Sequence, residues 1–478
     1  MKIDNHPTVR RHLASGRAAR GTDPLDADRL RALARECGAD DAGLVAIDRP
    51  ELDDQREEIL SRHPWTKTLL AFVRRMSREP VRSPARSIAN LEFHHKGEDV
   101  NEIALRIVER LEAEGVRAVS PAMGFPMEMM RFPERIWVVG HKPVAVAAGL
   151  GHMGIHRNVI HPKFGNFVLL GTVLLDAEAT GQDHPLDYNP CLECNLCVAA
   201  CPVGAISNQG DFNFSACITH NYREFMGGFN DWVEQVVDSR SVPDYRSRIN
   251  DADTASLWQS LSFGANYKSA YCMAVCPAGE DVIGPYLADK KGHLTEVVKP
   301  LQEKAETVYV VPGSDAEGHV KKRFKNKWVK HVGSGARPHT VRSFLEALPY
   351  SFQRQAAEGL SATYHFTFTG EEERRATVVI ADEKIEVHEG LVGQPTLRVT
   401  ADSRTWIGIL GQERSLLWAI VTRRLRLKGS PLLLARFGKC FPSAPVGRRV
   451  SEDHREHALA SPRLTPFLRN DEKTGHIR

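Results

Sequence analysis

The sequence predicts an α+β protein built from three folded units, and three observations predict it. From residue 25 to 182, helical stretches alternate with short, continuously apolar strands, as in a sheet covered by helices. From 183 to 290, seven of the cysteines recur at short spacings. From 337 to 445, strands with alternating apolar residues precede helices with one apolar face, which indicates a sheet-plus-helices domain.

The first unit follows a polar, basic N-terminal arm, residues 1–24, which we expect to be flexible. Apolar residues from Leu30 to Cys37 follow the spacing of one helix face, and Gly38 is placed to end that helix. Comparable patterns of apolar residues predict the later strands and helices of this unit. Strands are expected at 43–47, 68–73, 116–119 and 167–175, and helices at 52–62 and 99–113.

A glycine-rich stretch lies near the end of this unit. Gly149, Gly151 and Gly154 form G-x-G-x-x-G, and Gly165 follows. As a sign of dinucleotide binding the motif is weak, because the stretch before it is helical or irregular and Asp176 only ends a strand. The glycines indicate that backbone passes close to a cofactor or, without any ligand, to another helix.

The cysteine spacing is the strongest chemical signal in the chain. Residues 191–202 read C-x2-C-x2-C-x3-C-P, the run that binds iron–sulfur clusters in bacterial ferredoxins. Its fourth cysteine usually reaches a second cluster, which predicts further ligands downstream. Zinc is the alternative, but the C-x3-C-P ending occurs twice and no zinc-type histidines are interleaved. The predicted metal ligands are Cys191, Cys194, Cys197, Cys201, Cys217, Cys272 and Cys276.

Composition limits the class of protein. The chain is 42% hydrophobic and 26% charged, and its net charge of +3 is too small to indicate nucleic acid binding. No apolar run predicts a membrane span, and no apolar segment follows Arg10 and Arg11 as in an export signal. Cys37 and Cys440 are expected to be buried thiols rather than disulfide partners. We therefore expect a cytoplasmic protein.

Two stretches flank the last cysteines. Helices expected at 222–237 and 246–261 would cover the clusters. Residues 291–336 are expected to form a basic linker, in which residues 321–331 hold seven basic residues and two aromatic residues. Such a stretch would suit an acidic electron donor, namely a reduced ferredoxin, flavodoxin or reductase, or would contact phosphates. The alternative is a solvated linker helix.

The third unit alternates apolar and polar residues in four strands. They are centred on 364–368, 378–380, 385–387 and 397–399, and helices are expected at 405–410 and 416–425. The tail, residues 446–478, is polar and basic, and we expect it to be poorly ordered.

Three stretches together resemble the superfamily of epoxyqueuosine reductases and reductive dehalogenases. They are residues 30–40, residues 148–154 with Phe164-Gly165, and the two cysteine motifs in that order. The resemblance covers about residues 25–290. It implies a nitroreductase-like, corrinoid-type α/β domain that binds cobalamin largely through backbone, and a two-cluster ferredoxin module that feeds electrons to the cobalt. It marks Gly149, Gly151, Gly154 and Gly165 as cofactor-binding positions.

The second cysteine motif departs from that family. Two-cluster members end with C-x2-C-x3-C-P, but Ser269 replaces the first of these cysteines. A serine oxygen as a fourth ligand would be a harder and less usual donor. The family's cross-over ligation implies a 4Fe-4S cluster on Cys191, Cys194, Cys197 and Cys276, and a second cluster, 4Fe-4S or 3Fe-4S, on Cys201, Cys217 and Cys272.

The catalytic residues are not identified by the sequence. Epoxyqueuosine reductases carry an aspartate proton donor before the glycine segment, but residues 138–144 contain no carboxylate, which argues against queuosine chemistry. His141 as a general acid and Arg157 as a stabiliser of a developing anion are weak candidates, and each is as readily structural.

The last unit resembles the sterol-carrier-protein-like domains in residues 364–370, 385–390, 400–406 and 425–429. That resemblance implies an apolar tunnel for lipids or other hydrophobic molecules. A filled core used for dimerisation or docking is the alternative, because every α+β domain needs such residues in its interior.

These expectations combine into one functional hypothesis. We expect an iron–sulfur oxidoreductase in which two clusters pass electrons to a buried cofactor, cobalamin, that reduces a small organic and hydrophobic substrate. The alternative is a non-catalytic electron-transfer or lipid-responsive binding protein. An electron relay alone would not need about 150 residues of α/β structure before its clusters.

Overall fold

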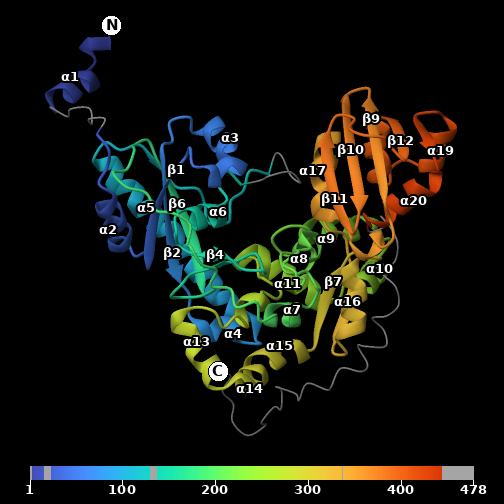
Figure 1. Cartoon of the computed structure of the whole chain (residues 1–478), viewed down its shortest axis with the longest axis horizontal. Coiled ribbons are helices and arrows are strands. Elements are labelled where there is room, and N and C mark those ends of the chain that lie inside the picture. The colour runs from blue at the N-terminus through green and yellow to red at the C-terminus, as the bar shows by residue number, and fades with distance from the viewer. Residues whose placement is uncertain (1–2, 16–22, 130–136, 336, 444–478) are drawn as a thin grey trace.

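A computed structural model of the chain describes residues 3–15, 23–129, 137–335 and 337–443 (Figure 1). It contains an α/β domain, a cysteine-bearing module and a C-terminal sheet-plus-helices domain, and the cysteine-bearing module lies between the other two. Of the predicted N-terminal arm, the structure describes a short 3-10 turn, η1 (Ile3–Asn5), and α1 (Pro7–Ala14), which buries no residue. The predicted tail, 446–478, lies outside the described residues.

The α/β domain is built on a four-stranded sheet in the order β1-β2-β6-β3, in which every neighbouring pair is antiparallel. Its sheet strands are β1 (Asp41–Ala46), β2 (Thr68–Arg75), β3 (Ala118–Val119) and β6 (Val168–Leu175), with a separate hairpin of β4 (His152–Met153) and β5 (Val159–Ile160). Its helices are α2 (Ala27–Glu36), η2 (Pro50–Leu52), α3 (Asp53–Arg62), α4 (Arg78–Arg82), α5 (Arg86–Ala113) and α6 (His141–Ala147).

Both faces of this sheet are buried, which explains why β2 is apolar without a break. On one face Phe72 packs in a core with Ile103 of α5, and on the other Leu69 packs with Ile59 of α3 and Val144 of α6. A strand that is covered on both sides has no solvent-exposed face, so apolar and polar residues do not alternate along it. The pattern therefore predicted the strand correctly.

Helix α5 is longer than the sequence predicts, because it begins at Arg86 rather than near Asp99. Its added N-terminal part leaves the α/β domain and contacts the cysteine-bearing module. The side chain of Asn90 pairs with the backbone of Tyr267 through bonds of 3.0 and 2.9 Å, and Phe93 packs in the core of that module. The helix thus joins two units that the sequence treats separately.

The cysteine-bearing module is mainly helical. Its elements are α7 (Leu196–Ala200), α8 (Phe214–His220), α9 (Gly228–Asp238), α10 (Val242–Arg248), α11 (Asp251–Phe263), α12 (Tyr271–Ala274), α13 (Glu280–Ala288), α14 (Lys290–His293), the π-helical turn η4 (Leu294–Val298) and α15 (Lys299–Glu303). After them come β7 (Glu306–Val310), α16 (Asp315–Arg323) and β8 (Lys327–His331).

The stretch expected to be a basic linker instead forms a β-α-β unit. Strands β7 and β8 pair in parallel, and Val308, Val310 and Val320 are buried in the same core as Cys197. Residues 321–331 are therefore not a solvated linker helix, because they end α16 and form β8. The prediction of a linker was wrong because two lysines of β8, Lys327 among them, are buried in spite of their charge.

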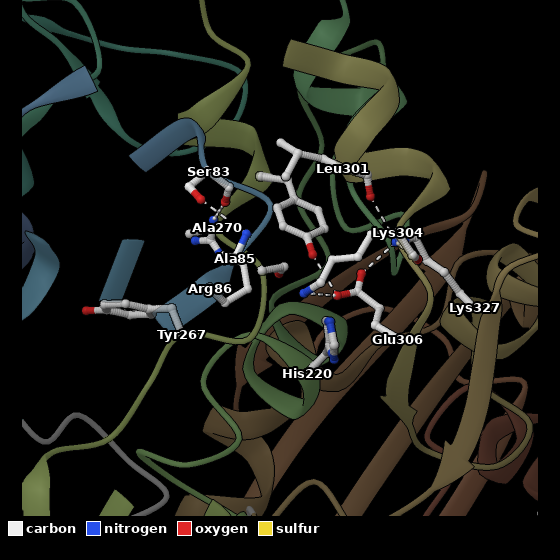
Figure 2. A network of polar contacts seen from close by, with 12 residues as sticks. Ser83, Ala85, Arg86, His220, Tyr267, Ala270, Leu301, Lys304, Glu306 and Lys327 are labelled. Carbon is white, nitrogen blue, oxygen red and sulfur yellow. Dashed lines mark hydrogen bonds and ion pairs between the residues drawn. The ribbon is translucent and has the colours of Figure 1, made fainter. Parts of the chain in front are cut away.

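An ion pair in this unit supports one of the cysteines (Figure 2). Lys327 Nζ donates to Glu306 Oε1 at 2.6 Å and to the carbonyl of Leu301 at 3.0 Å. The hydroxyl of Tyr271 donates to the other oxygen of Glu306 at 2.6 Å, and the Arg86 guanidinium lies 5.4 Å from the Tyr271 ring centroid. These contacts hold the start of α12, the short helix that carries Cys272.

The C-terminal domain is a five-stranded sheet in the order β11-β10-β9-β12-β13, in which only β9 and β12 are parallel. Its strands are β9 (Ala362–Thr369), β10 (Arg374–Ala381), β11 (Lys384–Glu389), β12 (Leu397–Asp402) and β13 (Leu425–Gly429). Its helices are α17 (Val341–Ser351), η5 (Gln355–Ala357), α18 (Ser403–Leu410), α19 (Leu416–Val421) and α20 (Pro431–Lys439). The helix predicted at 416–425 ends at Val421, because residues 422–424 turn the chain into β13, which begins at Leu425.

Aromatic rings occupy the interior of the C-terminal domain. The ring of Phe366 lies 5.5 Å from that of Trp406 and 5.4 Å from that of Phe437, and Phe344 lies 5.4 Å from Trp406. All four side chains are buried. Within the described part of this core, these rings pack against one another.

The C-terminal domain contacts the cysteine-bearing module beside the loop that follows Cys201. Arg354 forms an ion pair with Asp211, and the rings of Phe214 and Tyr350 meet edge to face at 5.7 Å. Among the residues described, no helix is long and apolar enough to cross a membrane.

Candidate iron–sulfur site

Four of the predicted ligands line one cavity. Cys191, Cys194, Cys197 and Cys276 line it together with Ile155, His156 and the loop after Cys276. Two residues between the first three cysteines, Glu193 and Asn195, adopt left-handed backbone with φ of 49° and 60°. These positions coil the chain tightly, so that three cysteines close in sequence face the same space.

The other three predicted ligands form a second group. Cys201 ends α7, Cys217 lies in α8 and Cys272 lies in α12. Burial, and then the nearby Cys201 thiol, raise the pKa of Cys272 to about 12. Burial, and then the thiols of Cys201 and Cys272, raise the pKa of Cys217. Cys272 also acts on Cys197 and Cys276 of the first group, so the seven cysteines lie close together, and their division into two ligand sets stays a prediction.

Backbone amides point at Cys201. Its Sγ accepts a hydrogen bond from the amide of Ala205 at 3.3 Å, and burial raises the pKa of this thiol while amides of residues 203–206 lower it. Amide donors favour a sulfur that carries negative charge, and hydrogen bonds to cluster sulfurs influence the reduction potential. The loop is suited to hold a metal-bound thiolate.

The second group has no fourth cysteine. All nine cysteines are placed, and the two outside the groups, Cys37 and Cys440, are buried in the cores of the other domains. Ser269 Oγ donates to Asn221 Oδ1 at 3.1 Å, and the amides of Ser269 and Ala270 bond the same oxygen. In the described chain, no three His, Cys, Asp or Glu side chains converge closely enough to hold a single metal ion.

The four glycines assigned to a cofactor are packed against the chain itself. A Cβ on Gly149 would lie 2.6 Å from the carbonyl oxygen of His184, and one on Gly151 would lie 2.5 Å from Val159. A Cβ on Gly154 would lie 2.8 Å from the His156 ring, and one on Gly165 would overlap the carbonyl oxygen of Ala278. Close backbone packing explains these glycines, and they do not fit a cradle for cobalamin.

The two catalytic candidates make structural contacts. His141 uses both ring nitrogens, at 2.9 Å from the Thr172 hydroxyl and 3.0 Å from the carbonyl of Ala122, and burial lowers its pKa. Arg157 is exposed, and its guanidinium donates to the carbonyl of Gly210 at 3.4 Å. Neither side chain lies among the seven cysteines, so their catalytic roles stay predictions.

Polar residues that the sequence did not mark lie beside the second group. Lys142 Nζ donates at 2.8 Å to both the carbonyl of Arg157 and Oδ1 of Asn158, and Asn158 Nδ2 lies 3.9 Å from Cys272 Sγ. Burial lowers the pKa of Lys142, while Cys272 and Cys217 raise it. No local spacing signals these residues, because Asn158 and Cys272 are 114 positions apart.

Two tyrosines border the same region. The rings of Tyr222 and Tyr267 meet edge to face at 5.3 Å. Burial, and then its neighbours Tyr267, Cys217 and Cys272, raise the pKa of Tyr222 well above its ordinary value. Both side chains are nonetheless partly accessible to solvent.

Two family models match parts of the chain. Residues 184–207, which hold the first cysteine run, match the 4Fe-4S binding domain. Residues 344–442 match the SCP-2 sterol transfer family. The two matches correspond to the cysteine-bearing module and the C-terminal domain.

Curated relatives match a limited part of the chain. The epoxyqueuosine reductase of Cellulophaga algicola is 33% identical over 100 residues, or 19% of this chain and 32% of that protein. That of Staphylococcus aureus is 37% identical over 82 residues, or 17% of this chain and 21% of that protein. The predicted resemblance to epoxyqueuosine reductases is confirmed. The matched part of the chain spans a third or less of these relatives.

Solved structures include an epoxyqueuosine reductase from Streptococcus thermophilus. It is 13% identical, with a TM-score of 0.31, and the alignment covers 55% of this chain and 82% of that one. The α+β fold class predicted from the sequence, including a sterol-carrier-like C-terminal domain, is confirmed.

Proposed function

We propose that this protein is an iron–sulfur reductase that binds two clusters, one on Cys191, Cys194, Cys197 and Cys276, and one on Cys201, Cys217 and Cys272. The observation that carries the proposal is that Cys191, Cys194, Cys197 and Cys276, which come from two separate segments, line one space. Iron–sulfur clusters bind such thiolate sets and supply one-electron transfer. The similarity to proteins named reductases supports catalysis rather than storage of iron.

The positions of the two groups support a direction for the electrons. The loop of the first group carries the exposed residues Leu192 and Glu193, so this cluster would lie near the surface and receive electrons. The second group lies beside Lys142 and Asn158 of the α/β domain. It would pass electrons to an acceptor bound beside Lys142 and Tyr222.

An acidic electron donor would bind near the first group. The basic end of α16 contacts α7, because the Arg323 guanidinium donates to the carbonyl of Ala199 at 3.3 Å. Lys321, Lys322 and Lys325, in and just after the last turn of α16, are exposed. Clustered exposed cations favour association with an acidic protein such as a reduced ferredoxin or flavodoxin, as electrostatic steering requires.

The acceptor and the substrate are the finer parts of the proposal. The resemblance implies cobalamin, for which the packed glycines supply no cradle, so no described residue is assigned to hold it. The substrate would be a small, hydrophobic organic molecule, which the SCP-2-like domain would present or shield. If deletion of residues 337–478 leaves turnover unchanged, that role of the domain is wrong.

Metal analysis of anaerobically purified protein tests the function. We expect about eight iron and eight sulfide per chain, or slightly less iron if the second cluster has three irons. Cobalt that stays bound through gel filtration would support cobalamin, and its absence would favour the alternative of an electron-transfer or lipid-responsive protein. Stoichiometric zinc in colourless protein would contradict the whole proposal.

A further inference from the structure

The second cysteine group is one protein ligand short of a complete four-iron site. Three thiols, Cys201, Cys217 and Cys272, belong to it, and the remaining six cysteines are all placed elsewhere. Ser269, which occupies the position of the missing cysteine, uses its hydroxyl to bind Asn221. The serine thus stabilises the turn before α12.

The side chains beside this group suit an anion. Lys142 spends two of its three ammonium hydrogens on the Arg157 carbonyl and Asn158, and Asn158 Nδ2 lies 3.9 Å from Cys272 Sγ. Tyr222 follows Asn221, which binds Ser269, and its ring meets that of Tyr267 at 5.3 Å. A half-buried cation such as Lys142 interacts with a negative ligand more strongly than a fully exposed one.

We propose that the second cluster keeps one iron without a protein ligand, and that this iron together with Lys142 binds a small organic anion through a carboxylate oxygen. The inference rests on the proposed function, because it needs the clusters. Carboxylate oxygen is a hard donor that prefers an iron not already surrounded by thiolates. A charge-assisted hydrogen bond from the ammonium would fix the second oxygen.

The first experiment asks whether Ser269 is a ligand. Ser269→Ala keeps the backbone amides that bind Asn221, so the turn should survive. We expect the variant to retain the iron content and the electron paramagnetic resonance spectrum of the parent, as should the distant control Ser260→Ala. Loss of the second cluster in Ser269→Ala alone would show that the serine oxygen binds iron, and would overturn the proposal.

The unmodified protein offers an independent measurement. Mild oxidation with ferricyanide should remove about one iron per chain and produce a three-iron spectrum, because an iron held by only sulfides and solvent is the most labile. Ferrous iron should restore the original spectrum. If no iron is lost under conditions that leave the first cluster intact, all irons have protein ligands and the proposal is wrong.

The ligand is tested with benzoate. Its addition should change the spectrum of the second cluster with a saturable dependence, and Lys142→Gln should weaken that binding at least tenfold. Lys428→Gln, which removes an exposed lysine of β13, should bind like the parent. No change on adding benzoate, or equal affinity in the two variants, would overturn the anion site. Absence of iron in every variant would instead contradict the proposed function itself.

Discussion

Gly165 is the residue where the α/β domain is tied to the cysteine-bearing module. Its φ is +64°, and an added Cβ would overlap the carbonyl oxygen of Ala278, two residues after Cys276. Glycine adopts this left-handed backbone without strain, but a residue with a side chain would be strained there and would also overlap the Ala278 carbonyl. The loop that positions Cys276 therefore depends on the absence of a side chain in a different domain.

Gly165→Ala should destabilise the protein by about 2 kcal/mol or more and reduce binding of the first cluster. The measurements are thermal unfolding and iron per chain. Gly284→Ala is the matched control, because its Cβ meets no atom within 4 Å and it lies inside α13. Alanine favours a helix there, so stability should stay equal or rise by up to about 1 kcal/mol. Equal behaviour of the two variants would contradict this reading of Gly165.

A predicted cluster ligand and a buried cysteine outside the two groups should respond differently to substitution. Cys276→Ala should remove one ligand of the first group and lower iron per chain by about half. Cys37→Ala should leave iron unchanged, because this thiol is buried in the core of the α/β domain, and it should cost only about 1 kcal/mol of stability. Metal analysis and the visible spectrum distinguish them. Loss of iron in Cys37→Ala would show that the assignment of ligands is wrong.

At the scale of elements, β7 and β8 carry a buried ion pair that supports α12. The Lys327 side chain is 0% exposed and that of Glu306 is 10% exposed. Burial raises the pKa of Glu306, but Lys327 and Lys304 outweigh it and the pKa is lowered overall. A buried pair contributes little net stability, yet removing one partner leaves an uncompensated charge.

Glu306→Gln should therefore destabilise the protein by about 3 kcal/mol, because Lys327 stays charged and buried. The double variant with Lys327→Met should recover most of that loss, since neither charge is then left alone. Urea unfolding of the three proteins measures both effects. The exposed Glu303→Gln should change stability by less than about 0.5 kcal/mol. A double variant as unstable as Glu306→Gln would contradict the pairing.

Helix α5 shows how one element can serve two domains. Its C-terminal half covers the sheet through Ile103, and its N-terminal half reaches Tyr267 through Asn90. The sequence predicts only the C-terminal half, because His94, His95 and Lys96 interrupt the apolar face of the helix. Those polar residues occur where the helix changes the domain that it packs against.

At the scale of the whole molecule, the C-terminal domain contacts the module close to the second cysteine group. Asp211 lies in the loop that follows Cys201, and Arg354 belongs to the C-terminal domain. The Arg354 ion pair lowers the pKa of Asp211. Because both side chains are more than one-third exposed, the pair is expected to contribute only about 1 kcal/mol or less.

Reversing one charge should loosen this contact. Arg354→Glu should speed limited proteolysis of the connection at residues 332–340 several-fold, and Asp211→Arg in the same chain should restore the parent rate. Arg342→Glu is the control, because the Arg342 guanidinium pairs with Glu346 of the same helix, α17. Equal cleavage of all the variants would show that this ion pair does not hold the domains together.

Local patterns account for much of what could be predicted. The spacing of residues 191–202 identified a cluster motif, because three cysteines within seven positions reach one space by coiling the chain alone. The apolar run of β2 and the alternation of β9 were read correctly, because burial on two faces or one face leaves its period in the sequence. The parallel pair β7–β8 was missed because its buried lysines look like surface residues.

The sequence by itself determined the ligand chemistry, the order of the units and most strands and helices, because these depend on neighbouring residues. Only the tertiary structure decided that Ser269 binds Asn221, and that Lys142 and Asn158 lie beside Cys272. The physical reason is distance along the chain: Ser269 and Asn221 are 48 positions apart and Asn158 and Cys272 are 114 apart, and no local period records which distant segments pack together.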